Sequence, residues 1–206
     1  MIWNRADELI LASASPRRAE LLRQIGIPFR QVVSGVDEDL HDPADPDEHV
    51  RELSRRKAED VAGRLGSGIV LGADTVVVLD EHILGKPADA REAGEMLAML
   101  SGRTHKVYTG LALIDAARKT TVSHVEVTEV TFRELSDDEI ADYVATGEPM
   151  DKAGAYGIQG KGSLLVSGIK GCYFNVVGLP LAGLLGALQR LEDLLLCAST
   201  HRSESH

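Results

Sequence analysis

The chain has 206 residues, of which 44% are apolar and 26% are charged, and its formal net charge is −10 at pH 7. This length and composition are typical of a soluble globular protein, so we expect a single α/β domain or two closely joined lobes. The negative charge argues against a general nucleic-acid or anionic-membrane surface, because such surfaces depend on clustered Lys and Arg. An anionic ligand would need a local basic pocket.

The cysteines and the chain ends indicate a reducing compartment. Cys172 and Cys197 form no CxxC pair or larger framework, which argues against a zinc site or a disulfide scaffold. The first residues lack the basic and apolar regions of a signal peptide. The most apolar segment, Leu179 to Leu196, is interrupted by Arg190 and Glu192, so it predicts a buried terminal helix rather than a membrane span. We expect a cytoplasmic protein.

The hydrophobic pattern of the first half predicts alternating strands and helices. Ser15 suits an N-cap and Pro16 a first helical residue, in a helix that ends at Gly26. Asp89 with Glu92 suits the capping box of a later helix. In chain order, the expected elements are a strand over 9–12, the first helix, a strand over 29–33, a helix over 46–65, a strand over 69–79, and a helix that ends at Gly102.

The second half predicts a sheet that is partly antiparallel. Residues 106–114 and 121–132 have the pattern of two long strands joined by a turn at 115–119. A capping box of Ser136 and Glu139 begins a further helix, and a glycine-rich loop follows over 151–160. The predicted fold class is therefore α/β with a mixed sheet flanked by helices, and not a pure Rossmann arrangement.

The start of the first predicted helix is a candidate phosphate site. Ser15 and Pro16 begin this helix, and Arg17 and Arg18 lie in its first turn. The unpaired N–H groups at a helix start bind anions, while the positive end of the helix dipole disfavours cations. Two arginines there are readily explained by an anion held between them. The alternative is two solvated arginines on a surface helix.

Asp74 interrupts the apolar run from Ile69 to Leu79. A carboxylate in such a run is costly to bury unless it binds a metal, pairs with a cation or titrates; a structural turn is the alternative. Glu38 lies in a separate acidic loop. Oxygen ligands without a neighbouring Cys or His cluster suit Mg²⁺ or Mn²⁺ that bridges substrate phosphates. Glu38 and Asp74 are therefore the predicted metal ligands, and Asp74 is the predicted water-activating residue.

Two lysines are further phosphate-binding candidates. Lys86 precedes Pro87 after a short strand, and Lys152 lies in the glycine-rich loop; an ordinary exposed lysine is the alternative for each. The glycines of that loop match neither GxGxxG nor GxxxxGK[ST], which argues against a dinucleotide or P-loop site. The 7 histidines show no metal-binding spacing, and we expect most of them to be surface or capping residues.

Four segments, taken together and in order, resemble the Maf family. They are Leu11–Arg18, Gly72–Thr75, Gly85–Pro87 and Asp151–Gly160. The resemblance covers roughly residues 8 to 190 and is more specific than any single motif. It implies an elongated mixed sheet flanked by helices, with two lobes around a central cleft, as in a Maf or ITPase-like fold. We expect one domain over residues 1–197 and a disordered tail over 198–206.

The same resemblance implies an enzyme that hydrolyses a nucleoside triphosphate to the monophosphate and pyrophosphate with Mg²⁺ or Mn²⁺. By this resemblance Asp74 matches the general base, and Glu38 and Lys86 match polar residues of the active site. Such a house-cleaning activity is also linked, in this family, to restraint of cell division.

The resemblance also concerns substrate choice, because Arg17, Thr75 and Gln159 match positions linked to it. A Gln in the last loop resembles the members that act on dTTP and UTP, whereas in members that prefer 7-methyl-GTP this loop has a different sequence and carries Glu. A neutral amide offers both a donor and an acceptor, as the edge of uracil or thymine requires, while a carboxylate only accepts. The expected substrates are therefore dTTP and UTP, with modified pyrimidine nucleotides left open.

Two other classes of protein stay open. A nucleotide-binding regulator of cell division would bind UTP with little turnover, and the set of Glu38, Asp74 and Lys86 argues against it. A nucleotidyltransferase would transfer the nucleotide to a sugar, but it normally opens with a glycine-rich phosphate loop. The expected partner is a small nucleotide rather than nucleic acid or a membrane. The sequence leaves open the number of metal ions and whether the chain forms a homodimer.

Overall fold

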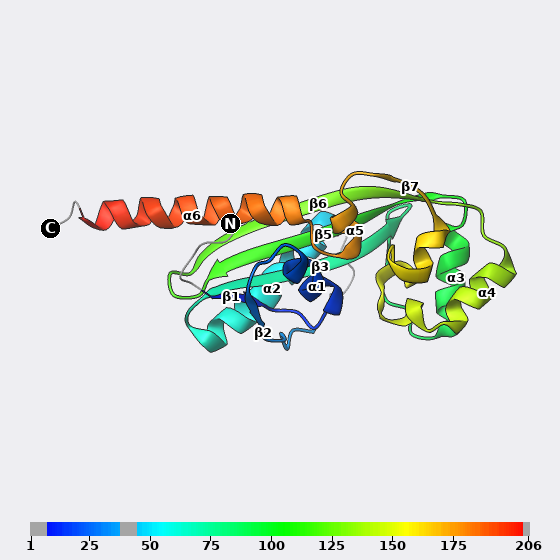
Figure 1. Ribbon diagram of the computed structural model, residues 1–206, viewed down its shortest axis with the longest axis horizontal. Helices are drawn as coiled ribbons and strands as arrows, with labels where there is room; N and C mark the ends of the chain where they lie inside the picture. Colours follow the sequence, from blue (N-terminus) through cyan, green and yellow to red (C-terminus); the bar gives the residue numbers. More distant parts are fainter. Residues whose placement is uncertain (1–7, 38–44, 204–206) are drawn as a thin grey trace. The chain divides into compact units, whose positions relative to one another are not determined.

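The computed structural model describes residues 8–37 and 45–203, and strands from both stretches form one sheet (Figure 1). The described strands lie in the order β2-β1-β3-β5-β6-β7, and β4 pairs with β3 outside this series. In chain order they are β1 (Leu9–Leu11), β2 (Phe29–Gln31), β3 (Ile69–Leu79), β4 (His82–Leu84), β5 (Thr104–Asp115), β6 (Thr120–Phe132) and β7 (Val166–Lys170).

The sheet combines parallel and antiparallel pairs. β1 lies parallel to both β2 and β3, so that Leu9 is paired with Phe29 on one side and with Ile69 on the other. β4 runs antiparallel to β3, and β7 runs antiparallel to β6. The three residues of β1 are all buried, as expected for a parallel strand covered on both faces. The predicted α/β class with a mixed sheet is confirmed.

The chain divides into two compact units. Unit 1 comprises residues 1–74, 110–125 and 179–206, and unit 2 comprises residues 75–109 and 126–178. The boundaries fall inside β3, β5 and β6, so each of these strands contributes residues to both units. The single domain, the elongated shape and the cleft expected from the sequence stay predictions.

In unit 1, the helices are α1 (Pro16–Gln24), α2 (Pro46–Leu65) and α6 (Leu181–Ser203). α1 begins as predicted: the side chain of Ser15 accepts a hydrogen bond from the backbone N–H of Arg18, and Pro16 is the first helical residue. Gly26 follows the helix with a φ of +70°, a backbone conformation that glycine adopts without strain. Residues next to each other in the sequence thus determine where α1 begins and where it ends.

α2 lies directly against the sheet because two glycines leave room for its backbone. A Cβ atom on Gly72 of β3 would lie 2.1 Å from the carbonyl oxygen of Ser54. A Cβ atom on Gly110 of β5 would lie 2.3 Å from the carbonyl oxygen of Val50. Any larger residue would force the helix away from the sheet, since protein interiors are close-packed. These two glycines therefore set how closely the side chains of α2 approach β3.

In unit 2, the helices are α3 (Ala90–Leu100), α4 (Asp137–Ala145) and α5 (Tyr173–Val177), with short 3₁₀ helices η1 (Glu148–Asp151), η2 (Ala153–Ala155) and η3 (Gly160–Leu165). α3 packs against α4 and η2 (Figure 1). The capping box predicted at Ser136 and Glu139 is confirmed, because each side chain accepts a hydrogen bond from the other residue's backbone N–H.

The structure corrects three expectations from the sequence. β2 ends at Gln31 rather than at residue 33, and the segment 151–160, expected to be a glycine-rich loop, contains η2 and overlaps the ends of η1 and η3. Residues 198–203, expected to belong to a disordered tail, continue α6 to Ser203. The chain holds no Gly or Pro after Gly186 and carries strong helix formers up to Ala198, so nothing local ends the helix earlier. Residues 204–206 lie outside the described residues.

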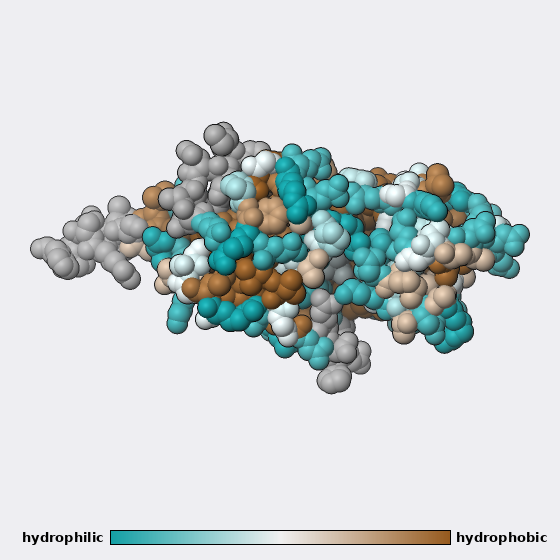
Figure 2. All heavy atoms as spheres, turned by 60° about the horizontal axis from the view of Figure 1, so that its bottom comes forward, coloured by the Kyte–Doolittle hydropathy of each residue, from teal (hydrophilic) through white to brown (hydrophobic). Residues whose placement is uncertain are grey.

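α6 is confirmed as a helix that buries one side. Leu184, Leu188, Leu191 and Leu195 recur at helical spacing and are all buried, while Leu194 and Leu196 are exposed. Within the described part of the chain, no helix combines the length and the apolar character that a membrane crossing requires. Hydrophilic side chains cover most of the face shown in Figure 2, and apolar side chains occupy smaller patches there.

Candidate active site

Asp74 lies on β3 with only 7% of its surface exposed, and its carboxylate pairs with a lysine. The Nζ atom of Lys57 donates a hydrogen bond to Oδ1 of Asp74 over 2.7 Å, and Lys57 itself is 5% exposed. A buried carboxylate is costly unless a cation or hydrogen-bond donors compensate its charge. The sequence left three ways to accommodate a buried Asp74: metal binding, pairing with a cation, or titration. The structure shows the pairing with a cation.

Lys57 reaches Asp74 because α2 presents it on the buried side of the helix. Leu53 and Val50 precede Lys57 by one and two helical turns and are completely or almost completely buried, so all three residues lie on the same stripe. Gly72, two residues before Asp74 on the same face of the strand, lets the helix approach closely enough for the lysine to meet the carboxylate. The Gly72-Ala73-Asp74-Thr75 motif therefore supplies both the carboxylate and the space beside it.

His49, at the start of the same stripe, is the other titratable neighbour of Asp74. Its Nε2 atom lies 4.0 Å from Oδ2 of Asp74, too far for a hydrogen bond. Burial lowers the pKa of His49; the neighbouring carboxylate of Asp74 opposes this shift, and the ammonium of Lys57 adds to it. The Nδ1 atom has no hydrogen-bond partner among the described residues. Asp74 therefore lies between an ammonium group and an imidazole that burial keeps largely neutral.

Lys57 and His49 are the site residues that the sequence analysis missed. Lys57 was not among the predicted site residues, and His49 was among the histidines expected to be surface or capping residues. The available signal was the spacing, because positions 50, 53 and 57 follow the apolar stripe of the helix. A lysine within an apolar stripe predicts a buried partner, although it does not name that partner.

The start of α1 forms a network of polar groups in unit 1. The guanidinium of Arg18 donates to the hydroxyl of Ser13 over 3.1 Å, and the backbone N–H of Ser15 donates to the same hydroxyl over 3.2 Å. The side chain of Gln31 on β2 donates to the carbonyl oxygen of Ser13 over 2.7 Å. Ser15 and Arg18 are therefore brought together as predicted, and Arg17 lies half-buried beside them. Their binding of phosphate stays a prediction.

Thr75 lies in unit 2, is half-buried, and belongs to a chain of hydrogen bonds that leads into the core. Its hydroxyl lies 2.9 Å from that of Thr109 on β5, and the Thr109 hydroxyl donates to the carbonyl oxygen of Asn175 over 3.0 Å. Thr109 and Asn175 are completely buried. Since successive side chains of a strand point to opposite faces, Thr75 does not share the face on which Asp74 meets Lys57. Its part in substrate choice stays a prediction.

Lys86 and Gln159 lie on two segments of unit 2 that are connected by a hydrogen bond between their backbones. Lys86 is exposed, and the carbonyl oxygen of the preceding Gly85 accepts a hydrogen bond from the backbone N–H of Gly154 over 3.0 Å. Gln159 is half-buried at the start of η3, and its side-chain amide makes no hydrogen bond to another described residue.

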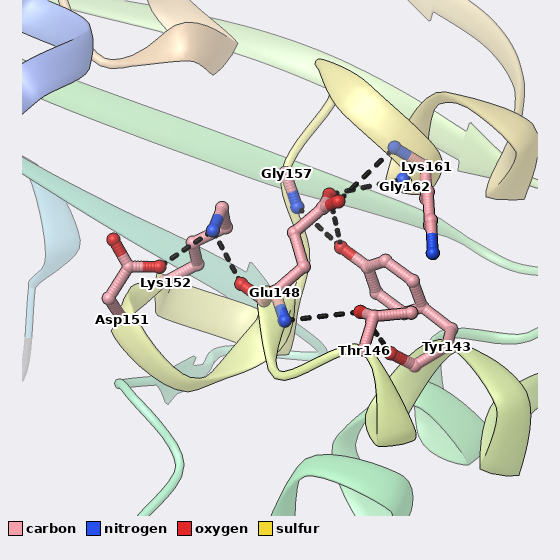
Figure 3. A network of polar contacts seen from close by, with 8 residues as sticks. All are labelled: Tyr143, Thr146, Glu148, Asp151, Lys152, Gly157, Lys161 and Gly162. Atoms are coloured by element: carbon pink, nitrogen blue, oxygen red, sulfur yellow. Dashed lines mark hydrogen bonds and ion pairs between the residues drawn. The ribbon is translucent and has the colours of Figure 1, made fainter.

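Two further residues of the predicted site have different outcomes. Glu38 lies outside the described residues, so its role as a metal ligand stays a prediction. Lys152 is not an ordinary exposed lysine: its Nζ atom donates to the backbone carbonyl of Glu148 and to Asp151 (Figure 3). Lys152 is thus engaged in the fold of its own loop.

Comparison with known proteins identifies the family. A family model described as "Maf-like protein" matches residues 8–191. A relative from Moorella thermoacetica, named dTTP/UTP pyrophosphatase, is 56% identical over 92% of this chain and 94% of its own. Relatives with the same name from Pelotomaculum thermopropionicum and Bacillus cytotoxicus are 53% and 52% identical, over 89% and 90% of this chain and 96% of their own lengths.

A solved structure, that of the Staphylococcus aureus Ham1 protein, is a weaker match. Its TM-score is 0.45 and its identity is 12%, over 61% of this chain and 71% of that chain. The family match, in contrast, includes every segment on which the sequence resemblance was based and covers most of the chain. The chain belongs to the Maf family.

Proposed function

We propose that this protein hydrolyses dTTP and UTP to the monophosphate and pyrophosphate. Relatives at 52%, 53% and 56% identity that it matches over nearly their whole length carry the name dTTP/UTP pyrophosphatase. The structural observation that carries the proposal is the buried pair of Asp74 and Lys57 in the Gly72–Thr75 motif. Because burying a charge is costly, a carboxylate that is placed and paired in this way marks a candidate functional site.

In the proposed reaction, Asp74 is the proton acceptor. The oxygen of a water molecule attacks the α-phosphorus, the bond from this phosphorus to the oxygen that bridges it to the β-phosphate breaks, and pyrophosphate leaves. The carboxylate of Asp74 accepts the proton of the attacking water, and Lys57 compensates its charge before the transfer. A positioned general base contributes about 10²–10⁴-fold to the rate.

The triphosphate would be bound by the groups predicted from the sequence to bind phosphate. Ser15, Arg17 and Arg18 lie at the start of α1, where backbone N–H groups and guanidinium groups suit phosphate oxygens. The contact between Arg18 and Ser13 supports this assignment, because it orients the guanidinium before a ligand arrives. Lys86 would add a further positive charge to the phosphates.

Mg²⁺ or Mn²⁺ is proposed as the metal, with Glu38 and Asp74 as its protein ligands. Asp74 fits this role in part, since its carboxylate oxygens keep lone pairs that Lys57 does not use. Among the described residues no three His, Cys, Asp or Glu side chains form a metal site by themselves, so the remaining ligands would come from Glu38 and the substrate. A bound divalent cation would neutralise charge on the phosphates.

We assign recognition of the pyrimidine ring to Gln159, with Arg17 and Thr75 as further contributors to substrate choice. The amide of Gln159 offers both a donor and an acceptor, which matches the carbonyl and N–H groups on the edge of uracil or thymine. That this amide makes no hydrogen bond to the other described residues supports its assignment to a ligand.

Release of pyrophosphate from UTP, dTTP, CTP and GTP tests the proposal. We expect turnover of UTP and dTTP with Mg²⁺ or Mn²⁺, loss of turnover in EDTA, and a decrease of about 10²-fold or more in Asp74→Asn. Asp80→Asn is the matched control, because Asp80 lies exposed just after β3 and pairs with Arg103. Binding of UTP by a folded wild type that releases no pyrophosphate would support the regulator of cell division instead, and full turnover in EDTA would exclude the metal.

A further inference from the structure

The carboxylate of Glu148 binds the backbone of the glycine-rich segment (Figure 3). One oxygen accepts a hydrogen bond from the N–H of Lys161, and the other accepts from the N–H of Gly162, each over 3.2 Å. The latter oxygen also accepts from the hydroxyl of Tyr143 over 3.0 Å. The Tyr143 hydroxyl in turn accepts from the N–H of Gly157 over 3.2 Å. Two side chains therefore hold the backbone on both sides of residues 158–160.

Glycines make this arrangement possible. A Cβ atom on Gly160 would lie 3.0 Å from a carboxylate oxygen of Glu148, and one on Gly162 would lie 2.2 Å from the carbonyl oxygen of Gly157. A Cβ atom on Gly157 would lie 2.7 Å from the Cε atom of Lys152. A side chain at position 162 would therefore displace the backbone of the segment, whereas one at position 157 or 160 would require the side chain of Lys152 or Glu148 to move.

Tyr143 can serve both partners because it stays protonated. It is 5% exposed, and burial raises the pKa of its hydroxyl above the ordinary value. The protonated hydroxyl donates its hydrogen to Glu148 and accepts from the backbone N–H of Gly157, which uses its donor and one of its lone pairs. The contacts of Tyr143 and Glu148 therefore form one connected network rather than two separate ones.

Gln159 lies inside the segment that this network holds. Its backbone is fixed from both sides, yet its side-chain amide is half-buried and makes no hydrogen bond to another described residue. A fixed backbone that carries an unused amide is suited to a ligand, because the cost of ordering the loop is met before the ligand binds.

We propose that Glu148 and Tyr143 are positioning residues for substrate choice, which hold residues 157–162 so that the Gln159 amide meets the base of the nucleotide. This inference rests on the proposed function, in which Gln159 reads the pyrimidine. Neither residue touches the substrate in this proposal, and both act through the backbone of the loop.

Two substitutions test the role of the network. Glu148→Gln keeps the shape but replaces an acceptor oxygen with an NH₂ group that faces a backbone N–H, and Tyr143→Phe removes only the hydroxyl. We expect each variant to lower the ratio of kcat/KM for UTP to that for CTP and GTP by about tenfold, mainly through KM for UTP. Glu139→Gln is the matched control, since Glu139 lies on α4 one helical turn before Tyr143 but pairs with Arg133 and caps its own helix. We expect the control to keep the wild-type ratio.

A double-mutant cycle separates positioning from general destabilisation. In a Gln159→Ala background, Glu148→Gln is expected to cause no further change in the selectivity ratio, because the group that it positions is gone. An unchanged ratio in folded Glu148→Gln, or an equal further loss in the Gln159→Ala background, would overturn the proposal.

Amide hydrogen exchange of residues 157–162 separates this proposal from the proposed function. We expect faster exchange in Glu148→Gln than in Glu139→Gln, with or without nucleotide. Equal exchange rates would overturn the positioning role even if the enzyme hydrolyses UTP. A wild type that hydrolyses no triphosphate would refute the proposed function and the role in substrate choice, whereas faster exchange in the variant would still show that Glu148 holds the loop.

Discussion

The ammonium nitrogen of Lys57 lies 2.7 Å from Oδ1 of Asp74, in a pair whose side chains are 7% and 10% exposed. A helix and a strand bring the two residues together across 17 positions of sequence. Two buried charges compensate each other only while both are present, since removal of either partner leaves the other without compensation. The stability of the fold and the chemistry proposed for Asp74 are therefore linked.

Lys57→Met keeps the length of the side chain but removes its charge. We expect a loss of about 3–5 kcal/mol in the free energy of unfolding at pH 7, measured by urea denaturation, because the carboxylate of Asp74 stays buried without its cation. Combining this change with Asp74→Asn should cost less than the sum of the two single changes. Strict additivity would contradict the direct coupling of the two residues.

Gly72→Ala tests the close packing of α2 on β3. The added methyl group would lie 2.1 Å from the carbonyl oxygen of Ser54, so we expect a loss of at least about 1–3 kcal/mol by thermal or urea unfolding. Gly63→Ala is the matched control, because Gly63 lies on α2 with nothing within 4 Å of the added atom. The control should gain about 0.5–1 kcal/mol from the higher helix propensity of Ala. Similar effects of the two changes would argue against the close approach.

His105 should make the stability of the protein depend on pH. It is buried in unit 2 with its Nε2 atom 2.8 Å from the hydroxyl of Tyr156, and burial lowers its pKa from 6.5 to about 4. Below pH 6.5 the unfolded chain binds a proton at this residue that the folded chain does not bind, so stability is complete above pH 6.5 and is lost as the pH falls toward 4. The expected loss from this residue between pH 7 and pH 5 is about 2 kcal/mol.

His105→Gln removes this titration and keeps a polar group for Tyr156. Urea unfolding at pH 7 and at pH 5 should show a smaller difference in stability for this variant than for the wild type. His82→Gln, at an exposed position of β4, is the control that should keep the wild-type difference. His49 contributes in the same direction through its lowered pKa and is unchanged in both variants. An undiminished pH dependence in His105→Gln would refute the assignment.

Gln159→Glu tests the proposed recognition of the base. A carboxylate lacks the donor that the amide offers to a carbonyl group of uracil or thymine, so we expect kcat/KM for UTP and dTTP to fall by about tenfold or more relative to GTP. The measurement is pyrophosphate release across a panel of nucleotides. An equal loss on every nucleotide would indicate that Gln159 shapes the site without reading the base.

Features whose causes lie within a few residues could be predicted from the sequence alone. Ser15 and Pro16 begin α1, and Ser136 with Glu139 begins α4, because the capping hydrogen bonds join residues that are near neighbours in the chain. The charge of Asp74 in an apolar run likewise marked the candidate base, because a carboxylate in such a run needs a compensating partner wherever the strand lies in the fold.

The groups that surround the carboxylate of Asp74 could not be predicted in this way, because they come from separate elements that meet only in the folded chain. The spacing of the apolar residues of α2 indicates that Lys57 faces the core. Its partner, however, depends on how closely the helix packs against β3 and on which residue of the strand lies opposite Lys57. The contact of Glu148 with the backbone of Lys161 likewise depends on the folding of a loop between them. Side-chain patterns with periods of 2 and 3.6 residues define faces of elements, whereas the pairing of two faces is set by packing over the whole core.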